Sequence, residues 1–315
     1  MITTINDLKA IIFSFLLLLQ LTSQADIIQL DDIYVEYMKR DARIAVKLGR
    51  RLAEDISHFQ KQIGQYPELS THLVISADES DYESKLDKSR EIMEFSQAYY
   101  SPRTRTIYIR NPRDGLNYRD LNRIVFHEYI HHFVFHYFSN APLWFHEGMA
   151  VFFSNDFSQG RELNLAAQYF MKNTRPLSSM QEYPDNRIEW ESYYAKSALA
   201  VRYLFTKRQR GFSRLWEKAE PQRKFNAAFQ RSFYQTVYEF SRNFEEYQSN
   251  HFKSMGMLFM GSILWMLLPF LFLFSIWRRK VQEKQLLRDM EAEEPVDIEY
   301  IYEIEIDEDK PEPEK

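Results

Sequence analysis

Cysteine is absent from this chain of 315 residues. Its absence excludes disulfide bonds, a thiol nucleophile and thiolate metal ligands, so any metal site must use histidine and carboxylate groups. Glycine is scarce, with 8 residues, whereas aromatic residues make up 16% of the chain. That aromatic content favours a packed or membrane-associated protein over a disordered one. The length allows one or two domains with a hydrophobic core.

Charged residues are absent from residues 254–277 (SMGMLFMGSILWMLLPFLFLFSIW). The run is long enough for a membrane-spanning helix, and lipid-embedded helices tolerate a proline such as Pro269. Trp277 and three basic residues at 278–280 follow, as is typical of the cytoplasmic end of such a helix. The sequence therefore predicts one C-terminal transmembrane helix, in contact with the lipid bilayer through residues 254–277.

Residues 1–25 are typical of a secretory signal peptide. Lys9 precedes an apolar core at 11–21 that is too short to span a bilayer comfortably, and small residues precede Asp26. We expect cleavage before Asp26, with an uncleaved anchor as the alternative. The predicted protein is thus a single-pass protein of a bacterial inner membrane, with residues 26–252 forming a periplasmic or extracellular domain.

Residues 278–315 are predicted to be an acidic cytoplasmic tail. From Val281 onward there are 14 acidic and 4 basic residues, which gives these residues a net charge of −10. Because the whole chain carries −5, the residues before Val281 carry about +5. Such a tail should be mostly disordered. Residues 298–307 alternate apolar and acidic side chains, a strand-like pattern that could pair with the sheet edge of a cytoplasmic partner.

Histidine is concentrated in residues 121–150, which hold five of the eight histidines. His127 begins an H-E-x-x-H motif that ends at His131. On a helix these two side chains lie one turn apart on the same face, where they can bind one zinc ion while Glu128 reaches a water molecule. A catalytic zinc site also needs a third protein ligand, for which Glu147 is the candidate.

The surroundings of the motif support a site. Apolar residues recur from 121 to 134 with helical spacing, which predicts a buried helix. A turn at 139–141 with Pro142 at a plausible first helical position predicts a second helix that carries Glu147. Because glycine is scarce, Gly148 directly after Glu147 indicates two backbones that approach closely.

The H-E-x-x-H motif with a downstream P-x-W-x-x-E-G-x-A at 142–150 resembles the gluzincin metallopeptidases, particularly the bacterial peptidase-MA-like families. The similarity covers approximately residues 30–244, and its specific part is residues 121–150. The resemblance implies a mostly helical, zincin-like catalytic domain with a small N-terminal sheet and one Zn²⁺ per chain. It also implies the site residues His127, His131 and Glu147 as zinc ligands and Glu128 as catalytic base.

Two features depart from the family pattern. The gap between His131 and Glu147 is shorter than in the best-known gluzincins, although a short gap is usual in the membrane-linked families. Val151 stands where an acidic residue would normally orient a ligand histidine, so the residues that orient the ligands stay unassigned.

The sequence also predicts the elements around the motif. Residues 30–63 have a helical pattern, 71–76 form a strand, and 99–110 form a hairpin, which gives an α+β fold. Further helices are predicted at 163–171, 193–204, 225–233 and 236–252, with a loop at 176–190. In gluzincins an edge strand near the active site binds extended substrate; residues 106–110 are the predicted equivalent, with an ordinary structural strand as the alternative.

Three side chains are candidates for donating a hydrogen bond to the oxyanion of a tetrahedral intermediate. Tyr194 is the first choice, because related peptidases carry a similar segment behind the site; Tyr193 and His146 are the alternatives. His132 and His136 also lie four residues apart and form a weaker second ligand pair, since they lack an adjacent glutamate and a third partner.

The predicted function is that of a zinc-dependent endopeptidase acting on a peptide or protein substrate, with no nucleic-acid partner. Glu128 would accept the proton of the attacking water and pass it to the leaving amine. A zinc-binding scaffold with weak activity and a cell-wall-directed amidase are the alternatives. An extended-peptide groove would favour the peptidase and a wide basic cleft the cell wall.

Overall fold

The computed structural model describes residues 25–86, 96–112, 118–184, 187–217, 219–221 and 223–292. The chain divides into two compact units, Met1–Ser249 and Asn250–Lys315. Most of the predicted signal peptide lies outside the described residues, as do residues 293–315 of the predicted tail with the strand-like segment. The described part of the first unit has the predicted α+β architecture, in which most residues are helical.

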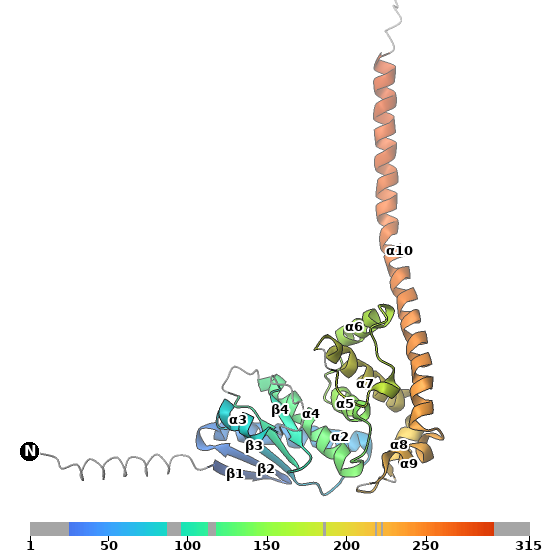
Figure 1. Cartoon of the computed structure of the whole chain (residues 1–315). Helices are drawn as coiled ribbons and strands as arrows, with labels where there is room; N and C mark the ends of the chain where they lie inside the picture. The colour runs from blue at the N-terminus through green and yellow to red at the C-terminus, as the bar shows by residue number, and fades with distance from the viewer. Residues whose placement is uncertain are drawn as a thin grey trace, which may run out of the picture. The chain divides into compact units, whose positions relative to one another are not determined.

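A five-stranded mixed sheet forms the N-terminal part of the first unit (Figure 1), in the order β1-β2-β3-β5-β4. The strands are β1 (Ala25–Leu30), β2 (Ile33–Met38), β3 (Thr71–Ile75), β4 (Ala98–Ser101) and β5 (Thr106–Ile109). The β1–β2 and β4–β5 pairs are antiparallel, whereas β3 runs parallel to β2 and β5. The predicted strand at 71–76 and the predicted hairpin are therefore confirmed.

Two sequence predictions about this region are wrong. Helix α2 is Ala42–Ile63, whereas residues 30–38 belong to the first hairpin. In β2 the buried and partly exposed side chains alternate from Ile33 to Glu36, as in a strand. A short apolar run is compatible with both the strand period of about 2 residues and the helical period of about 3.6, so it does not distinguish them. The second error concerns the sheet edge: β5 lies between β3 and β4, so β4 and not residues 106–110 is the edge strand beside the site.

Helix α4 (Tyr118–Tyr137) is the predicted motif helix, and it packs against β4 and α2. Phe59 of α2 lies at the centre of this contact. Its ring makes edge-to-face contacts with Phe126, Tyr129 and Phe133 of α4, with centroids 4.9–6.3 Å apart. This aromatic packing fixes one face of α4 in the core and leaves the opposite face, with the motif histidines, toward a cleft.

Helix α5 (Leu143–Phe153) packs against α4 and α7 (Arg187–Lys207), and α6 (Gln159–Phe170) and α8 (Gln209–Glu217) also pack against α7. The other helices are α3 (Glu79–Lys85), which contacts β5, α9 (Phe225–Phe233), which contacts α8, and α10 (Val237–Ala292), with short 3-10 turns η1 (Lys39–Asp41) and η2 (Leu177–Ser179). The helices predicted at 163–171 and 225–233 are confirmed within a few residues. The helix predicted at 193–204 is longer than expected, because α7 begins at Arg187, inside the predicted loop at 176–190. The close approach predicted at Gly148 is also confirmed, because a Cβ there would lie 2.3 Å from the Ser197 carbonyl oxygen of α7.

The transmembrane helix predicted for residues 254–277 is wrong. These residues lie inside α10, and among the described residues no helix has both the length and the apolar character needed to cross a membrane.

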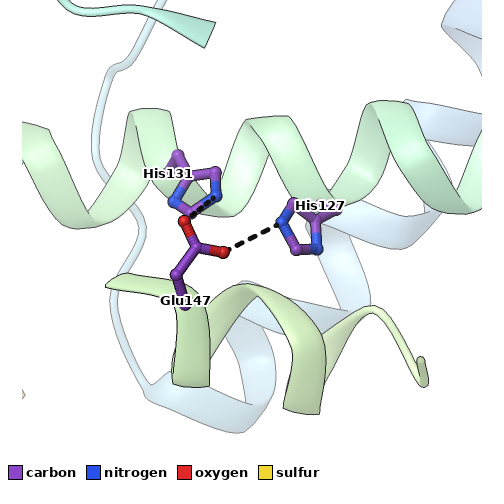
Figure 2. A group of neighbouring side chains, drawn as sticks. All are labelled: His127, His131 and Glu147. Atoms are coloured by element: carbon purple, nitrogen blue, oxygen red, sulfur yellow. Dashed lines mark ion pairs between the residues drawn. The ribbon is translucent and has the colours of Figure 1, made fainter. Parts of the chain in front are cut away.

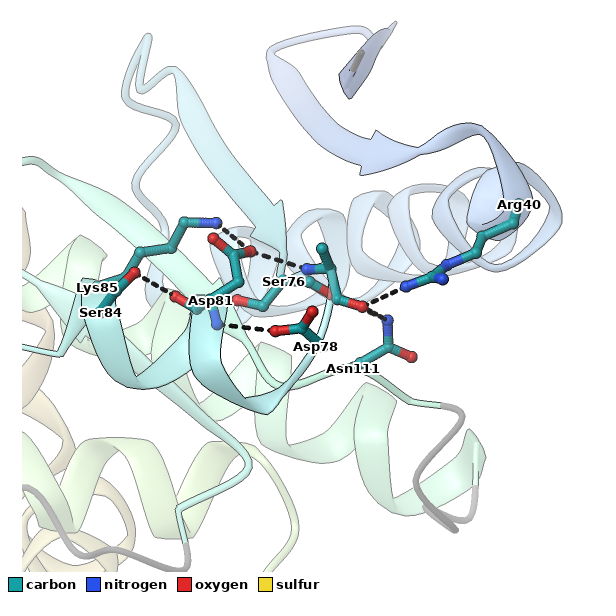
Figure 3. A network of polar contacts seen from close by, with 8 residues as sticks. Arg40, Ser76, Asp78, Asp81, Ser84, Lys85 and Asn111 are labelled. Atoms are coloured by element: carbon teal, nitrogen blue, oxygen red, sulfur yellow. Dashed lines mark hydrogen bonds and ion pairs between the residues drawn. The ribbon is translucent and has the colours of Figure 1, made fainter. Parts of the chain in front are cut away.

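A polar network fixes the connection between β3 and α3 (Figure 3). Asn111, just after β5, donates hydrogen bonds from Nδ2 to the carbonyl oxygens of Ser76 (2.9 Å) and Ala77 (2.8 Å). Asp81 accepts from the Ala77 amide at 2.8 Å and from Lys85 Nζ at 2.7 Å. The network holds the ends of β3 and β5 together and so supports the β4–β5 hairpin beside α4.

Candidate metal centre

Two helices supply the side chains of the candidate site. His127 and His131 project from α4 toward α5, which carries Glu147 (Figure 2). Helix α5 is almost entirely apolar, and Trp144 and Phe145 are fully buried on either side of its first turn. Pro142 is the residue just before this helix rather than its first residue. Burial of α5 therefore brings the single carboxylate of that helix against the two imidazoles.

The geometry fits one metal ion. The Glu147 carboxylate lies 3.6 Å from His127 Nε2 through Oε2 and 3.6 Å from His131 Nε2 through Oε1. The three ligand atoms lie within 4.8 Å of one another. Tetrahedral zinc ligands at about 2.0–2.2 Å from the metal lie roughly 3.3–3.6 Å apart. Glu147 is 2% exposed, and its Oε2 has no hydrogen-bond partner. A buried carboxylate oxygen without a partner is costly unless a cation binds it, so these residues fit a divalent metal.

The pKa values of Glu147 and His127 also suit the binding of a metal ion. Burial raises the pKa of Glu147, but the nearby His131 and His127 and a hydrogen bond from Tyr183 outweigh it and lower the pKa to about 2. Burial lowers the pKa of His127, while Glu147 and Glu128 more than reverse this and raise it. Glu147 is therefore an anion throughout the neutral pH range.

Glu128 lies in the same cleft with a different environment. Burial is the main cause that raises its pKa, to about 7, and the Glu147 charge adds to it; His127 and the Tyr100 amide oppose the rise. The Tyr100 amide of β4 donates to Glu128 Oε2 at 2.8 Å. A carboxylate with a pKa near neutral pH suits a group that accepts and returns a proton.

An open cleft of about 1080 Å³ lies over these residues. Its walls include β4, the second half of α4, the start of α5, the segment before α7 with the first turns of α7, and the start of α10 within the first unit. Among the described residues that line the cleft there is no lysine or arginine, whereas Glu128, Glu147 and Glu182 are present. The described part of the cleft is therefore acidic and aromatic.

Two of the three candidate oxyanion donors reach this cleft. Tyr194 lines it, and burial with the charges of Glu147 and Glu128 raises the pKa of this phenol well above its usual value, so it keeps its proton. His146 also lines the cleft, with its ring centroid 6.1 Å from that of His131. Tyr193 is buried and donates to the Met180 carbonyl oxygen at 3.5 Å.

The second histidine pair is not arranged as a metal site. His132 is 2% exposed, its Nδ1 lies 3.0 Å from Tyr100 Oη, and its Nε2 lies 3.2 Å from the Ser70 carbonyl oxygen. Both ring nitrogens are thus used in packing α4 against the sheet. Burial lowers the pKa of His132 to about 4, so the ring is neutral. His136 is only partly buried at the last turn of α4.

One residue of the site has no signal in the sequence. Tyr183, in the segment between η2 and α7, donates a hydrogen bond from Oη to Glu147 Oε1 at 2.5 Å. It lies 36 residues after Glu147, in a region predicted only as a loop, and no motif or periodicity links the two positions. The structure places it where the sequence left the orienting residue unassigned.

No protein-family model matches the chain, and no curated protein matches it significantly. The resemblance to gluzincins therefore depends on the motif residues and on the arrangement described above.

Proposed function

We propose that the protein is a zinc-dependent endopeptidase of the gluzincin type. The observation that supports this most strongly is the buried Glu147 carboxylate, whose two oxygens each face one of two imidazoles that lie one helical turn apart at an open cleft. His127, His131 and Glu147 would hold the metal, with one ion per chain. The bound zinc would supply Lewis acidity, which makes water a stronger nucleophile near neutral pH and polarises the peptide carbonyl.

Glu128 moves the proton in this proposal. Its carboxylate is adjacent to His127 in the chain and lines the same cleft. With a pKa of about 7 it can accept the proton of the attacking water and return it to the leaving amine. Tyr194 keeps its proton and can donate a hydrogen bond to the oxygen on which negative charge develops.

The character of the cleft favours an internal peptide bond as substrate. The described lining offers no cation that would bind the terminal carboxylate of a peptide or an anionic wall polymer. The cleft is open, and the edge strand β4 lies along it, where an extended chain can add by backbone hydrogen bonds. These features favour an endopeptidase over a wall-directed amidase.

The test is hydrolysis of casein by the full chain loaded with zinc, beside the Glu128→Gln variant. We expect the variant to bind zinc as the parent does and to lose at least about 100-fold in turnover, because the amide cannot accept the proton. Glu217→Gln on α8 is the matched control and should behave as the parent. Turnover by Glu128→Gln at the parent's rate would contradict the mechanism, and zinc binding without hydrolysis by the parent would favour the scaffold.

A further inference from the structure

The two oxygens of the Glu147 carboxylate have different surroundings. Oε1 accepts the Tyr183 hydrogen bond at 2.5 Å and lies 3.6 Å from His131 Nε2. Oε2 has no hydrogen-bond partner and lies 3.6 Å from His127 Nε2. One oxygen is thus already occupied by a phenol, and the other is left for a cation.

Packing holds the Tyr183 ring in place. The ring stacks on Trp190 of α7, with centroids 4.9 Å apart and an angle of 19° between the planes. It also contacts Tyr193, with centroids 6.0 Å apart. Tyr183 is 37% exposed, so one side of the residue faces the cleft while its hydroxyl reaches the buried carboxylate. These contacts involve only the ring of Tyr183, so they fix the direction of the hydroxyl and leave it to donate to Glu147.

The segment that carries Tyr183 is anchored before the tyrosine. Glu245 of α10 accepts a hydrogen bond from the Leu177 amide at 2.7 Å. Lys196 of α7 donates to the Arg175 carbonyl oxygen at 2.6 Å, and Tyr193 donates to that of Met180 at 3.5 Å. Three bonds to two helices therefore restrain a segment that has little regular secondary structure of its own.

We propose that Tyr183 is a positioning residue that occupies Oε1 of Glu147 and so presents only Oε2 to the metal. This inference depends on the proposed metal site and assigns the orienting residue that the sequence leaves open. A carboxylate that bound through both oxygens would fill the position that a catalytic metal must keep open for water or substrate. A phenol bonded to one oxygen prevents this and also fixes the plane of the carboxylate.

The test compares zinc binding by the parent and by Tyr183→Phe, in the full chain, through competition with a chromogenic chelator. The phenylalanine keeps the ring and its stacking on Trp190 and removes only the hydroxyl. We expect zinc affinity to fall about 10- to 100-fold, as is usual when a residue that orients a metal ligand is lost. Tyr203→Phe on α7 is the matched control and should leave the affinity unchanged.

X-ray absorption at the zinc edge separates positioning from a general loss of structure. The parent should show one close carboxylate oxygen, and Tyr183→Phe should show a second one at the metal. Equal affinity and equal coordination in the two proteins would overturn the role of Tyr183 and leave the proposed function standing. A parent that binds no zinc would overturn both.

A second variant tests the inference if Tyr183→Phe does not fold. Trp190→Leu removes the stacking partner but keeps the Tyr183 hydroxyl. We expect its zinc affinity to fall by less than that of the phenylalanine variant, because the hydroxyl is displaced only part of the time. An affinity in Trp190→Leu equal to that of the parent would contradict the proposed positioning of Tyr183.

Discussion

At the scale of single residues, the site contains a buried carboxylate, Glu147, and a partly buried one, Glu128, that titrate very differently. Burial raises the pKa of both, but Glu147 faces two imidazoles and a phenol, which lower its pKa to about 2. Glu128 has one amide donor and a negative neighbour, so its pKa is about 7. In the proposed mechanism their environments suit Glu147 to hold a cation and Glu128 to exchange a proton.

Tyr194→Phe tests the assignment of the oxyanion donor. We expect kcat for casein or a peptide to fall about 100-fold, while zinc affinity and KM change little, because the hydrogen bond forms only as charge develops. Tyr203→Phe should keep its activity, since Tyr203 is not among the described residues that line the cleft. If Tyr194→Phe keeps its kcat and His146→Gln loses it, His146 is the donor and the assignment to Tyr194 is wrong.

The residues of the site were predictable to the extent that they lie close in the sequence. The i, i+4 spacing of His127 and His131 places them on one helical face wherever the helix packs, and the structure brings Glu147 to them. Tyr100 and Tyr183 contact the two carboxylates from distant parts of the chain. Such contacts depend on how the sheet and the segment before α7 meet the helices, which no local pattern encodes.

At the scale of elements, the packing of α5 against α7 positions Glu147, the proposed third ligand. Gly148 allows the approach, because a Cβ there would lie 2.3 Å from the Ser197 carbonyl oxygen and 2.6 Å from Val201 Cγ2. Gly148→Ala should therefore destabilise the fold by about 3 kcal/mol, since α7 backbone cannot move aside easily. Zinc affinity should also fall, because a displaced α5 moves Glu147.

Gly160→Ala is the matched control for this prediction. A Cβ at Gly160 of α6 would meet only Ser158 Oγ, at 3.7 Å, so alanine should stabilise its helix by about 0.5–1 kcal/mol. Urea denaturation of the three proteins measures the difference. Equal midpoints for Gly148→Ala and the parent would show that the close approach of the helices is not required.

Lys196 and Glu245 join α7 to α10 through an ion pair of 2.8 Å, and Lys196 is 1% exposed. Burial lowers the pKa of Lys196, and Glu245 opposes the fall. Glu245→Gln should destabilise the fold by about 2 kcal/mol at neutral pH, because it leaves a buried cation without its partner. Lys196→Met should destabilise the fold by less, about 1 kcal/mol. Glu245 is partly exposed and still accepts the hydrogen bond from the Leu177 amide in this variant.

The loss of stability in the Glu245→Gln variant should depend on pH. Without Glu245 the pKa of Lys196 in the folded state falls further below the value of 10.5 for a free lysine. At a pH between the lowered pKa of Lys196 in the folded variant and the value of 10.5 in the unfolded chain, the unfolded chain binds more protons than the folded one. The stability of the variant therefore rises with pH in this range. Chemical denaturation from about pH 7 to 10 should show the variant approaching the parent, and a loss that stays constant over this range would contradict a buried cation.

The elements themselves were predictable where the chain offers long or well-bounded patterns. The strand at 71–75 and the β4–β5 hairpin have short apolar runs between turns, and α4, α7 and α9 have clear helical spacing. Residues 30–38 were mistaken for helix because Ile33, Val35 and Met38 fit both periodicities. The edge position of β4 could not be predicted, because sequence order does not fix the strand order β3-β5-β4.

At the scale of the whole molecule, the α+β class followed from the order of the elements, whereas the transmembrane helix did not hold. The uncharged length of residues 254–277 predicts a membrane span, but among the described helices none is long and apolar enough for one. The site lies in the first compact unit and uses β4, α4, α5 and the segment before α7. The geometry of the site therefore does not depend on a membrane-spanning helix.

The most direct test of the central claim is the zinc content of the purified full chain, measured beside Glu147→Ala after both have been dialysed against a weak chelator. The proposed site predicts about one zinc per chain in the parent, from three protein ligands, and a large loss in the variant, which keeps only the two histidines. Zinc that is absent from the parent, or retained equally by Glu147→Ala, would contradict the site formed by His127, His131 and Glu147.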